Sequence, residues 1–244
     1  MRKDFVIGIH PVINAIKEGI EFKQLLIARN KKLPFIEEFL QKNKDKRSLV
    51  VYKNLSEIER LFPNSQGIVM FIKRFEYADE EETVLNVIKS KKVLLAFSGI
   101  MDVRNIGAVA RTAQASGLVG GIILPKHRSL DITPAAIKAS TGSLLSIPVV
   151  RLSNLRYFVK DLKRRGVSVI GVEKRGSVRY DMLKYDLPIC CVFGSESKSL
   201  SDVFLRDLDQ NVYIPMSNDF NSLNLSVASS ILLYEIFRQK NFEL

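Results

Sequence analysis

The chain has 244 residues, of which 46% are hydrophobic, so it can bury a core as one large domain or two smaller ones, and we expect two. Its 37 Lys and Arg against 26 Asp and Glu give a formal net charge of +11, which favours an anionic partner such as nucleic acid or a membrane surface. No segment approaches the roughly 18 apolar residues of a membrane span, and the N-terminus lacks an apolar core of signal-peptide length, so we expect a soluble, cytoplasmic protein without a membrane partner.

The first 75 residues alternate strand-like apolar runs with stretches of helical periodicity. Lys and Arg number 15 here against 8 acidic residues, and the difference, +7, is much of the excess charge of the chain. We therefore expect residues 1–75 to form a small α/β domain. The helical stretches lie at 10–19, 33–43 and 55–62, and the apolar runs at 23–28, 48–53 and 67–75.

Residues 76–92 interrupt this alternation with an acidic cluster, which is typical of a linker that ends in a short helix. From there on, near-continuous apolar runs alternate with helical segments. Such runs are expected of strands that are buried on both faces of a mostly parallel sheet, so residues 93–244 are predicted to form a second α/β domain. The runs lie at 92–100, 117–125, 166–172, 188–194 and 211–216.

The chain offers little for a disulfide or a metal site. Cys190 and Cys191 are adjacent within an apolar run and are interpreted as buried strand residues. His10 and His127 are the only histidines and lie far apart in the sequence, so we expect no metal.

In open α/β sheets, ligands bind beyond the carboxyl ends of the strands, so polar residues that directly follow an apolar run are the first candidates for a site. The first such cluster is residues 98–117, where Asp102 suits the N-cap and Gly117 the C-cap of a helix. Arg104 and Arg111 are two turns apart on one face of this helix. That face suits a phosphate or a partner subunit, although a solvated basic face is the simpler interpretation of the spacing.

A second cluster, residues 192–201, places Gly194, Ser195 and Glu196 in a turn directly after an apolar run. A glycine at this point lets the backbone approach a ligand closely. An ordinary turn that is capped by serine and glutamate is the alternative interpretation.

The third cluster, residues 214–235, runs from a polar loop into a helix that is rich in serine. Ser222 is expected to cap this helix, which leaves Asn224 in the first turn without a capping role. The first turn is therefore expected to face a site, while the small residues that follow keep the helix slim and buried on most sides.

In this order, the three clusters resemble the signature motifs of the SpoU branch of the SPOUT-class methyltransferases, which transfer a methyl group from S-adenosylmethionine to a ribose 2′-hydroxyl in RNA. The resemblance covers nearly the whole chain, and residues 1–75 are similar to the small RNA-binding domain of bacterial 23S rRNA guanosine methyltransferases of this branch. It implies an α/β fold in which a trefoil-knotted, mostly parallel domain follows the RNA-binding domain. Strand alternation alone would suggest a Rossmann-like sheet, because knotted chains are rare. The matching stretches are "DVRNIGAVARTAQASG", "VFGSESKSLS" and "IPMSNDFNSLNLSVASSILLYE".

Carried over residue by residue, the resemblance implies a cofactor site and a catalytic set. S-adenosylmethionine would lie against the backbone at Gly194, Ile214 and Leu223, with the strand end at Gly171 and Val172 as a further wall. The catalytic set maps onto Asn105, Arg111, Glu196, Ser222 and Asn224.

The resemblance also implies a homodimer through the C-terminal domain, in which Arg111 approaches the cofactor of the neighbouring subunit. No metal is needed for a displacement at the sulfonium methyl. Since an arginine is effectively always protonated, we expect Arg111 to stabilise the developing alkoxide and to hold a neighbouring phosphate rather than act as a base. The proton acceptor is not assigned.

Several positions depart from the pattern of the family. Val103 stands in place of a proline, Ser197 and Ser199 in place of glycines, and Asn218 in place of a glycine in the third motif. A serine with positive φ would cost about 1 kcal/mol, so altered cofactor affinity or loop mobility is expected. Ser65 stands where relatives often have histidine, which affects the expected RNA contact.

The predicted function is therefore 2′-O-methylation of a guanosine in 23S rRNA. The separate basic N-terminal domain is what favours rRNA over tRNA. A tRNA ribose methyltransferase is the alternative within the class, and a catalytically silent RNA-binding or ribosome-assembly protein is the alternative of another class. A Rossmann enzyme is disfavoured because the chain has no G-x-G-x-x-G motif.

Overall fold

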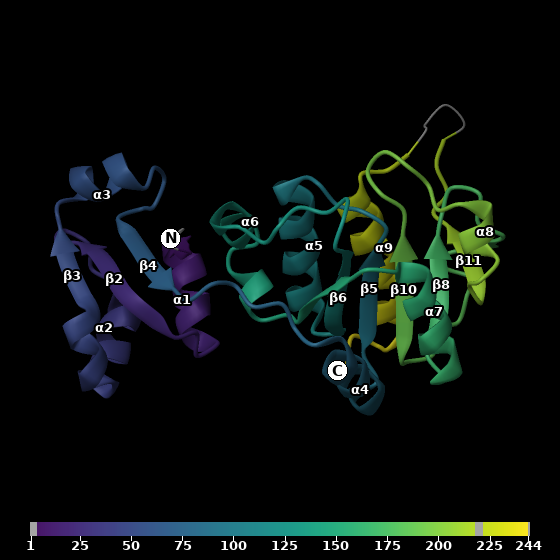
Figure 1. Cartoon of the computed structure of the whole chain (residues 1–244), viewed down its shortest axis with the longest axis horizontal. Helices are drawn as coiled ribbons and strands as arrows, with labels where there is room; N and C mark the ends of the chain where they lie inside the picture. The colour runs from purple at the N-terminus through teal and green to yellow at the C-terminus, as the bar shows by residue number, and fades with distance from the viewer. Residues whose placement is uncertain (1–3, 218–221, 244) are drawn as a thin grey trace. The chain divides into compact units, whose positions relative to one another are not determined.

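The computed structural model describes residues 4–217 and 222–243 of the chain, which divide into two compact units (Figure 1). Unit 1 comprises the described residues up to Glu76 together with Ile132–Ser146, and unit 2 comprises Tyr77–Asp131 and the chain from Ile147 onward. The expected boundaries at 75/76 and 92/93 stay a prediction. Asn218 lies outside the described residues.

The sheet of unit 1 has four strands, β1 (Phe5–Ile7), β2 (Phe22–Ala28), β3 (Val50–Lys53) and β4 (Ile68–Ile72), in the order β1-β4-β2-β3. β4 pairs antiparallel with β1 and β2, and β2 pairs parallel with β3. The helices of this unit are α1 (Ile9–Lys17), α2 (Pro34–Lys42), the 3₁₀ helix η1 (Lys44–Leu49), α3 (Leu55–Leu61), α6 (Pro134–Ala139) and the 3₁₀ helix η2 (Ser143–Leu145).

The segment Ile132–Ser146 packs on α1, although it lies far from α1 in the sequence. The side-chain amide of Asn14 donates to the carbonyl of Thr141 at 2.8 Å. Gly142 has φ of 92°, and a Cβ at this position would lie 2.9 Å from the Cβ of Asn14. A glycine is therefore required for this segment to approach the helix.

Ser65 has a structural role in unit 1. Its side chain is fully buried, and its hydroxyl donates to the Glu59 carboxylate at 2.7 Å. The same carboxylate accepts the backbone N–H groups of Asn64 and Gly67, so it holds together the turn that precedes β4. Because Ser65 is buried, its side chain does not provide a surface contact for RNA.

The sheet of unit 2 has seven parallel strands in the order β7-β6-β5-β10-β8-β11-β9. This confirms the mostly parallel sheet that the apolar runs predict. The strands are β5 (Val93–Phe97), β6 (Val119–Pro125), β7 (Val149–Leu152), β8 (Ser168–Val172), β9 (Val178–Arg179), β10 (Ile189–Phe193) and β11 (Gln210–Tyr213). The helices are α4 (Glu80–Ser90), α5 (Val103–Ser116), α7 (Leu155–Arg164), α8 (Asp202–Leu205) and α9 (Leu225–Gln239).

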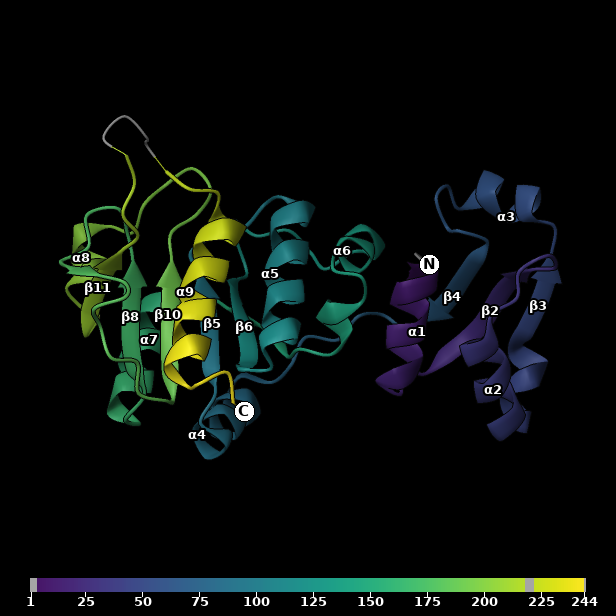
Figure 2. The same ribbon diagram turned by 180° about the vertical axis from the view of Figure 1, so that it is seen from behind.

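Helices cover both faces of this sheet. α4 and α7 lie on one face, and α5 and α9 lie side by side on the other (Figures 1 and 2). Every residue of β5 and β10 is buried, which explains why these strands are apolar throughout rather than alternating. One continuous core joins Val84 and Val87 of α4 to Phe158 and Leu162 of α7 across the strands.

The strand order of unit 2 reverses at the centre of the sheet. From β5 the chain proceeds to β6 and β7 on one side, whereas β10, β8 and β11 lie on the other side. Loops that leave neighbouring strands in opposite directions open a crevice beyond the carboxyl ends of those strands. The sheet therefore brings the segments that follow β5, β8 and β10 together at one edge.

Both cysteines are free and fully buried in β10, and burial raises the pKa of the Cys191 thiol to about 12. Within residues 4–217 and 222–243, there is no helix of the length and apolar character that crossing a membrane would require.

Candidate active site

The helix α5 begins where the sequence predicts. Asp102 is its N-cap and accepts the N–H of Arg104 at 2.8 Å, and Gly117 ends it with φ of 65°. The Asp102 carboxylate also accepts the guanidinium of Arg104 at 2.8 Å, and this guanidinium holds the pKa of the carboxyl below its ordinary value. Arg104 is thus engaged within its own turn, so of the two arginines predicted on this face, only Arg111 lacks a partner among the described residues.

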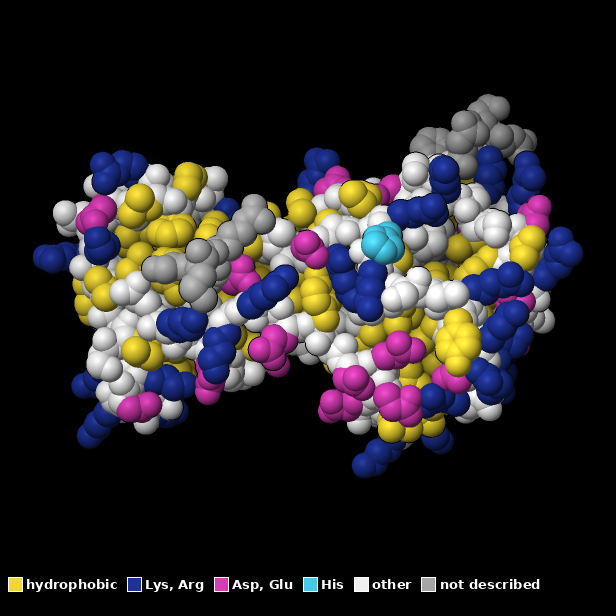
Figure 3. Space-filling model, viewed as in Figure 1, with side chains coloured by type: hydrophobic (Ala, Val, Ile, Leu, Met, Phe, Trp, Pro, Cys, Tyr) yellow, Lys and Arg dark blue, Asp and Glu magenta, His cyan; other side chains and the backbone are white. Residues whose placement is uncertain are grey.

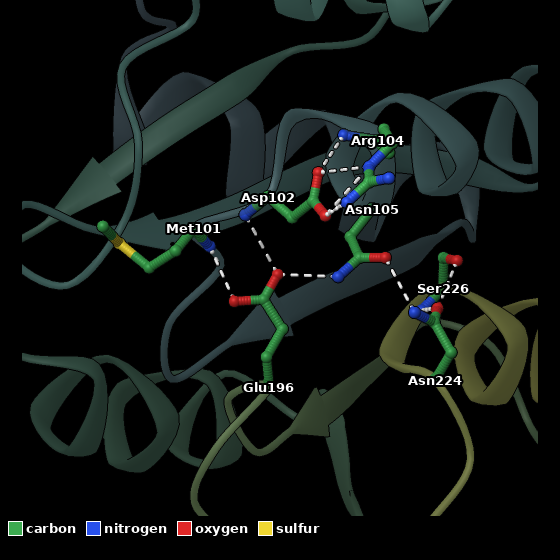
Figure 4. Close-up of polar contacts among 7 residues, drawn as sticks. All are labelled: Met101, Asp102, Arg104, Asn105, Glu196, Asn224 and Ser226. Carbon is green, nitrogen blue, oxygen red and sulfur yellow. Dashed lines mark hydrogen bonds and ion pairs between the residues drawn. The ribbon is translucent and has the colours of Figure 1, made fainter.

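Glu196 joins the loop after β10 to the start of α5 (Figure 4). One oxygen of its carboxylate accepts the N–H of Met101 at 2.9 Å, and the other accepts the N–H of Asp102 at 3.1 Å and the side-chain amide of Asn105 at 2.7 Å. Asn105 is buried, so its amide has a fixed orientation. The carboxylate therefore fixes both the backbone before α5 and the side chain of Asn105.

Asn224 extends the same network to α9 (Figure 4). Its side-chain N–H donates to Asn105 Oδ1 at 3.0 Å, and its Oδ1 accepts the N–H of Ser226 at 2.9 Å. Asn224 is therefore the N-cap of α9, and the prediction that Ser222 caps the helix is wrong. Both residue types are good caps, and the helix begins two residues later than expected because the Asn224 side chain accepts the N–H of Ser226.

The turn that follows β10 is compact and closes over Gly194. The N–H of Ser195 donates to the carbonyl of Lys198 at 2.8 Å. A Cβ on Gly194 would lie 2.7 Å from that same carbonyl oxygen, so only glycine fits at this position. Ser197 and Ser199 are not among the residues with positive φ, so the strain expected from replacing glycines there does not arise.

Glu173 directly follows β8 and supports this turn, and the sequence analysis did not select it. Its carboxylate accepts the N–H of Leu200 at 2.6 Å. Burial raises the pKa of the Glu173 carboxyl above its ordinary value, against the opposing effect of the hydrogen bonds from Leu200 and Ser199. The rule that polar residues after an apolar strand mark a site could have found it.

A cavity of about 440 Å³ lies where these segments meet. Of the residues expected at the site, those that line it are Asn105, Val172, Gly194, Glu196, Ile214, Ser222, Leu223 and Asn224. The other lining residues are Glu173, Lys174, Phe193, Ser195, Ser197, Lys198, Ser199, Met216, Leu225 and Ala228. Polar groups thus come from α5, from the segments after β8 and β10 and from the residues before α9, and apolar groups come from β8, β10, α9 and the residues after β11.

Two expected site residues do not line this cavity. Gly171 lies within β8, where a Cβ would meet Asn211 Oδ1 at 2.4 Å and Leu208 Cδ1 at 2.6 Å, so strand packing explains this glycine. Arg111 is exposed on α5, and within the described part of the chain its side chain has no hydrogen bond or ion pair.

The helix α9 is less buried than the sequence suggests. It packs along α5, and the hydroxyls of Thr112 and Ser230 lie 3.0 Å apart between the two helices. On the same helix, Val227 and Tyr234 are 45% and 44% exposed, which contradicts the expectation of a helix buried on most sides. The small residues of α9 allow close packing on α5, but in a single chain they do not cover its apolar side.

Glu173 provides a pH-dependent test of this geometry. The pKa of the Glu173 carboxyl is raised in the folded protein, so the folded protein binds the carboxyl proton more tightly than the unfolded chain does. The protonated carboxyl therefore favours folding at low pH. That contribution is lost as the pH rises from the ordinary pKa of 4.5 through the raised value. Glu173→Gln should therefore gain stability relative to wild type across this window. Urea unfolding between pH 4 and 7 checks this, with the exposed Glu18→Gln as control, and parallel curves for wild type and Glu173→Gln would refute it.

No group of three or more His, Cys, Asp or Glu side chains is arranged to hold a metal ion anywhere in residues 4–217 and 222–243.

Comparison with protein families gives two matches that together span most of the chain. Residues 92–234 match the model of the SpoU rRNA methylase family. Residues 5–78 match the model described as RNA 2′-O ribose methyltransferase substrate binding. The first match covers the first two polar clusters and the third up to residue 234, and the second match falls mostly within unit 1.

Individual relatives are similar over nearly their whole length. A TrmH family tRNA/rRNA methyltransferase of Staphylococcus saprophyticus is 35% identical over 99% of this chain and 98% of its own. Among solved structures, the SpoU methyltransferase AviRb from Streptomyces viridochromogenes, in complex with the cofactor AdoMet, has a TM-score of 0.81 at 24% identity, over 97% of this chain and 90% of its own. An AdoMet-bound rRNA methyltransferase from Sinorhizobium meliloti has a TM-score of 0.79 at 27% identity, over 97% and 87%.

Proposed function

Because the chain belongs to the SpoU rRNA methylase family, we propose that it transfers the methyl group of S-adenosylmethionine to a ribose 2′-hydroxyl of its RNA substrate. It is an RNA methyltransferase with a substrate-binding unit and a methylase unit. The observation that carries the proposal is the hydrogen-bonded chain from Glu196 through Asn105 to Asn224, which borders the 440 Å³ cavity.

The cavity fits a cofactor of this kind. Its volume of about 440 Å³ lies within the usual range for small-molecule sites. Gly194 lines the cavity without a side chain, and Val172, Ile214 and Leu223 supply apolar walls. These residues, with Phe193, would hold the adenosine part by contact and by backbone hydrogen bonds.

The bound cofactor would supply an electrophilic methyl group, so the protein has to align the ribose and stabilise charge. Glu196 keeps the backbone at Met101 and Asp102 and the side chain of Asn105 in one arrangement. Asn224 fixes the other side of Asn105. We infer that Asn105 and Ser222 position the 2′-hydroxyl at the mouth of the cavity.

The contacts of Glu196 argue against its being the base. Both of its oxygens already accept N–H groups, from two backbone amides and one side-chain amide. The lone pairs of a carboxylate held in this way are directed at those donors rather than at a substrate hydroxyl. Its proposed role is therefore to position Asn105 and the start of α5.

Arg111 enters the proposal through a second copy of the chain. It is exposed on α5, on the side of the sheet that also carries the exposed Val227 and Tyr234 of α9. An apolar surface of this kind is typical of a dimer interface. We propose a homodimer through α5 and α9, in which Arg111 of one subunit stabilises the developing alkoxide at the site of the other.

The proposed substrate is a guanosine of 23S rRNA, reached in the cytoplasm. The net charge of +7 in residues 1–75 supports a long RNA, because separate basic domains add phosphate contacts away from the site. The relative from Sinorhizobium meliloti is an rRNA methyltransferase, which agrees with this choice. We also propose that residues 93–244 form the trefoil knot and that residues 76–92 are the linker that precedes it.

The test is methyl transfer from labelled S-adenosylmethionine to 23S rRNA, 16S rRNA and bulk tRNA in parallel, followed by mapping of the labelled nucleotide. The expected result is label at one guanosine of 23S rRNA. Label in tRNA alone would keep the chemistry and overturn the substrate. If the protein binds S-adenosylmethionine but labels none of the naked RNAs, the assay is repeated on 50S particles, and failure there refutes the proposed substrate.

A further inference from the structure

A short basic loop follows β6 in unit 2, and the proposed reaction makes no use of it. We define the basic loop as residues 126–131. Lys126, His127 and Arg128 are consecutive and exposed. Within the described part of the chain, none of these three side chains has a hydrogen bond or an ion pair. In Figure 3, Lys and Arg side chains gather around the histidine that is visible on unit 2.

The basic loop is attached to the candidate site through the segment that follows β5. The N–H of Leu130 donates to the carbonyl of Ile100 at 2.9 Å, and the N–H of Ile100 donates to the Ser129 hydroxyl at 3.3 Å. The next residue along this segment, Met101, donates its N–H to Glu196. The segment Ile100–Met101 therefore connects the basic loop to the Glu196 carboxylate by hydrogen bonds on either side.

Gly99 brings the basic loop close to the turn over the cavity. A Cβ at Gly99 would lie 2.8 Å from the carbonyl oxygen of Arg128 and 3.3 Å from the Cβ of Ser195. Arg128 and Ser195 thus flank the same backbone position from two different segments. The backbone of the basic loop accordingly lies beside the turn that lines the cavity, rather than on a remote surface.

A side chain from β7, Arg151, supports the basic loop from beneath. The guanidinium of Arg151 donates to the carbonyls of Lys126 and Ser129, each at 3.3 Å, and to that of Leu130. It also pairs with Asp131 at 3.3 Å and lies over the ring of Tyr77 at 5.0 Å. The Arg151 side chain is only 15% exposed, so its charge supports the loop from beneath and does not reach a ligand.

The backbone of the basic loop is also unusual. Arg128 has φ of 64°, in the left-handed region that bulky residues seldom occupy. Conformations of this kind persist where the surrounding structure imposes them, and they are frequent at binding sites. Here the contacts of Arg151 and Ile100 impose the conformation, which directs two cationic side chains and one imidazole outward.

We propose that the basic loop is a second RNA contact, in which Lys126 and Arg128 bind the phosphates beside the methylated nucleotide while Arg151 acts as the positioning residue. This inference rests on the proposed function, since it assigns the RNA backbone to the rim of the same site. The only acidic side chain of the loop, Asp131, is already engaged by Arg151. Unpaired cations in a preorganised loop match the regular negative charge of a phosphodiester chain.

The salt dependence of RNA binding tests this inference directly, without relying on turnover. The affinity of the full-length protein for a 23S rRNA transcript is measured by filter binding at several KCl concentrations. Lys126→Gln and Arg128→Gln should each reduce the slope of log Kd against log salt by about one unit. They should leave S-adenosylmethionine affinity within about twofold of wild type, because neither side chain lines the cavity. Lys89→Gln, at an exposed position of α4, is the matched control and should leave the slope unchanged.

Arg151→Lys separates positioning from direct contact. This variant keeps the charge but loses the forked geometry that reaches three carbonyls. A reduced slope in Arg151→Lys, with normal circular dichroism and cofactor binding, is expected because the loop then no longer presents its cations to the phosphates. Unchanged slopes in Lys126→Gln and Arg128→Gln would overturn the inference. Should the wild type bind RNA and transfer no methyl group, the proposed function fails, while the slopes still decide whether the basic loop contacts RNA.

Discussion

Replacing Glu196 with alanine is expected to lower kcat for methyl transfer by roughly 10²–10³-fold, the range found when a preorganised group at a reacting centre is removed. The carboxylate accepts three N–H groups that belong to Met101, Asp102 and Asn105. Without it, the start of α5 and the Asn105 side chain lose their common anchor. Single-turnover transfer with saturating cofactor measures the effect.

Two further variants show whether the loss is due to the carboxylate. In Glu196→Gln, an NH₂ group replaces one carboxylate oxygen and faces an N–H donor that it cannot accept. The kcat of this variant should therefore be nearly as low as that of Glu196→Ala. Ser197→Ala, in the same turn, should retain most of the activity, because Ser197 does not anchor α5. Near-normal kcat in Glu196→Ala, with intact cofactor binding, would contradict the proposed role of the network.

Arg111→Ala is expected to lower activity to a similar extent, and to do so in the neighbouring subunit rather than its own. When Arg111→Ala and Glu196→Ala proteins are mixed after denaturation and refolded together, about half of the dimers should contain one chain of each type. Each mixed dimer has one site with both residues intact. The mixture should therefore recover about a quarter of wild-type activity, although each parent is nearly inactive.

The refolded parents provide the control for this experiment. Each parent refolded alone must stay inactive, and wild type refolded alone must recover its activity. Arg111→Lys should keep part of the activity if the role of the guanidinium is electrostatic. If the mixture recovers nothing while wild type refolds well, Arg111 does not act at the site of the neighbouring subunit.

The sequence predicts the elements of the site better than it predicts their details. Near-continuous apolar runs indicate strands buried on both faces, and β5 and β10 are buried throughout. Asp102 and Gly117 mark the ends of α5 correctly because capping depends on local residue type. The rule for strand ends also selects Gly194 and Glu196, which the parallel sheet brings to the edge where Asn105 lies.

Features that depend on long-range packing could not be predicted in this way. Asn224 caps α9 in place of Ser222, a choice that also satisfies the distant amide of Asn105. The glycine at position 171 is explained by Asn211 and Leu208, which come from elsewhere in the chain. The packing of Ile132–Ser146 on α1 depends on Gly142 and Asn14, whose proximity has no signal in the local sequence.

The substitutions of Ser197 and Ser199 for glycine illustrate the limit of transferring a pattern from relatives. Their φ values are not positive, and the Glu173 carboxylate supports the end of the turn through Leu200. The turn therefore keeps its shape by side-chain hydrogen bonding rather than by glycine flexibility. Glu173 itself directly follows a strand, which is the position where a ligand site is expected.

The central claim is that this chain methylates ribose rather than a base, and the most direct measurement is nucleoside analysis of RNA labelled by the purified protein. RNA that carries label from S-adenosylmethionine is digested to nucleosides, and the labelled product is identified by mass spectrometry, with Asn105→Ala as the inactive control. The account predicts a single 2′-O-methylated nucleoside that is absent with Asn105→Ala. A methyl group on a base, or equal label with the control variant, would contradict it.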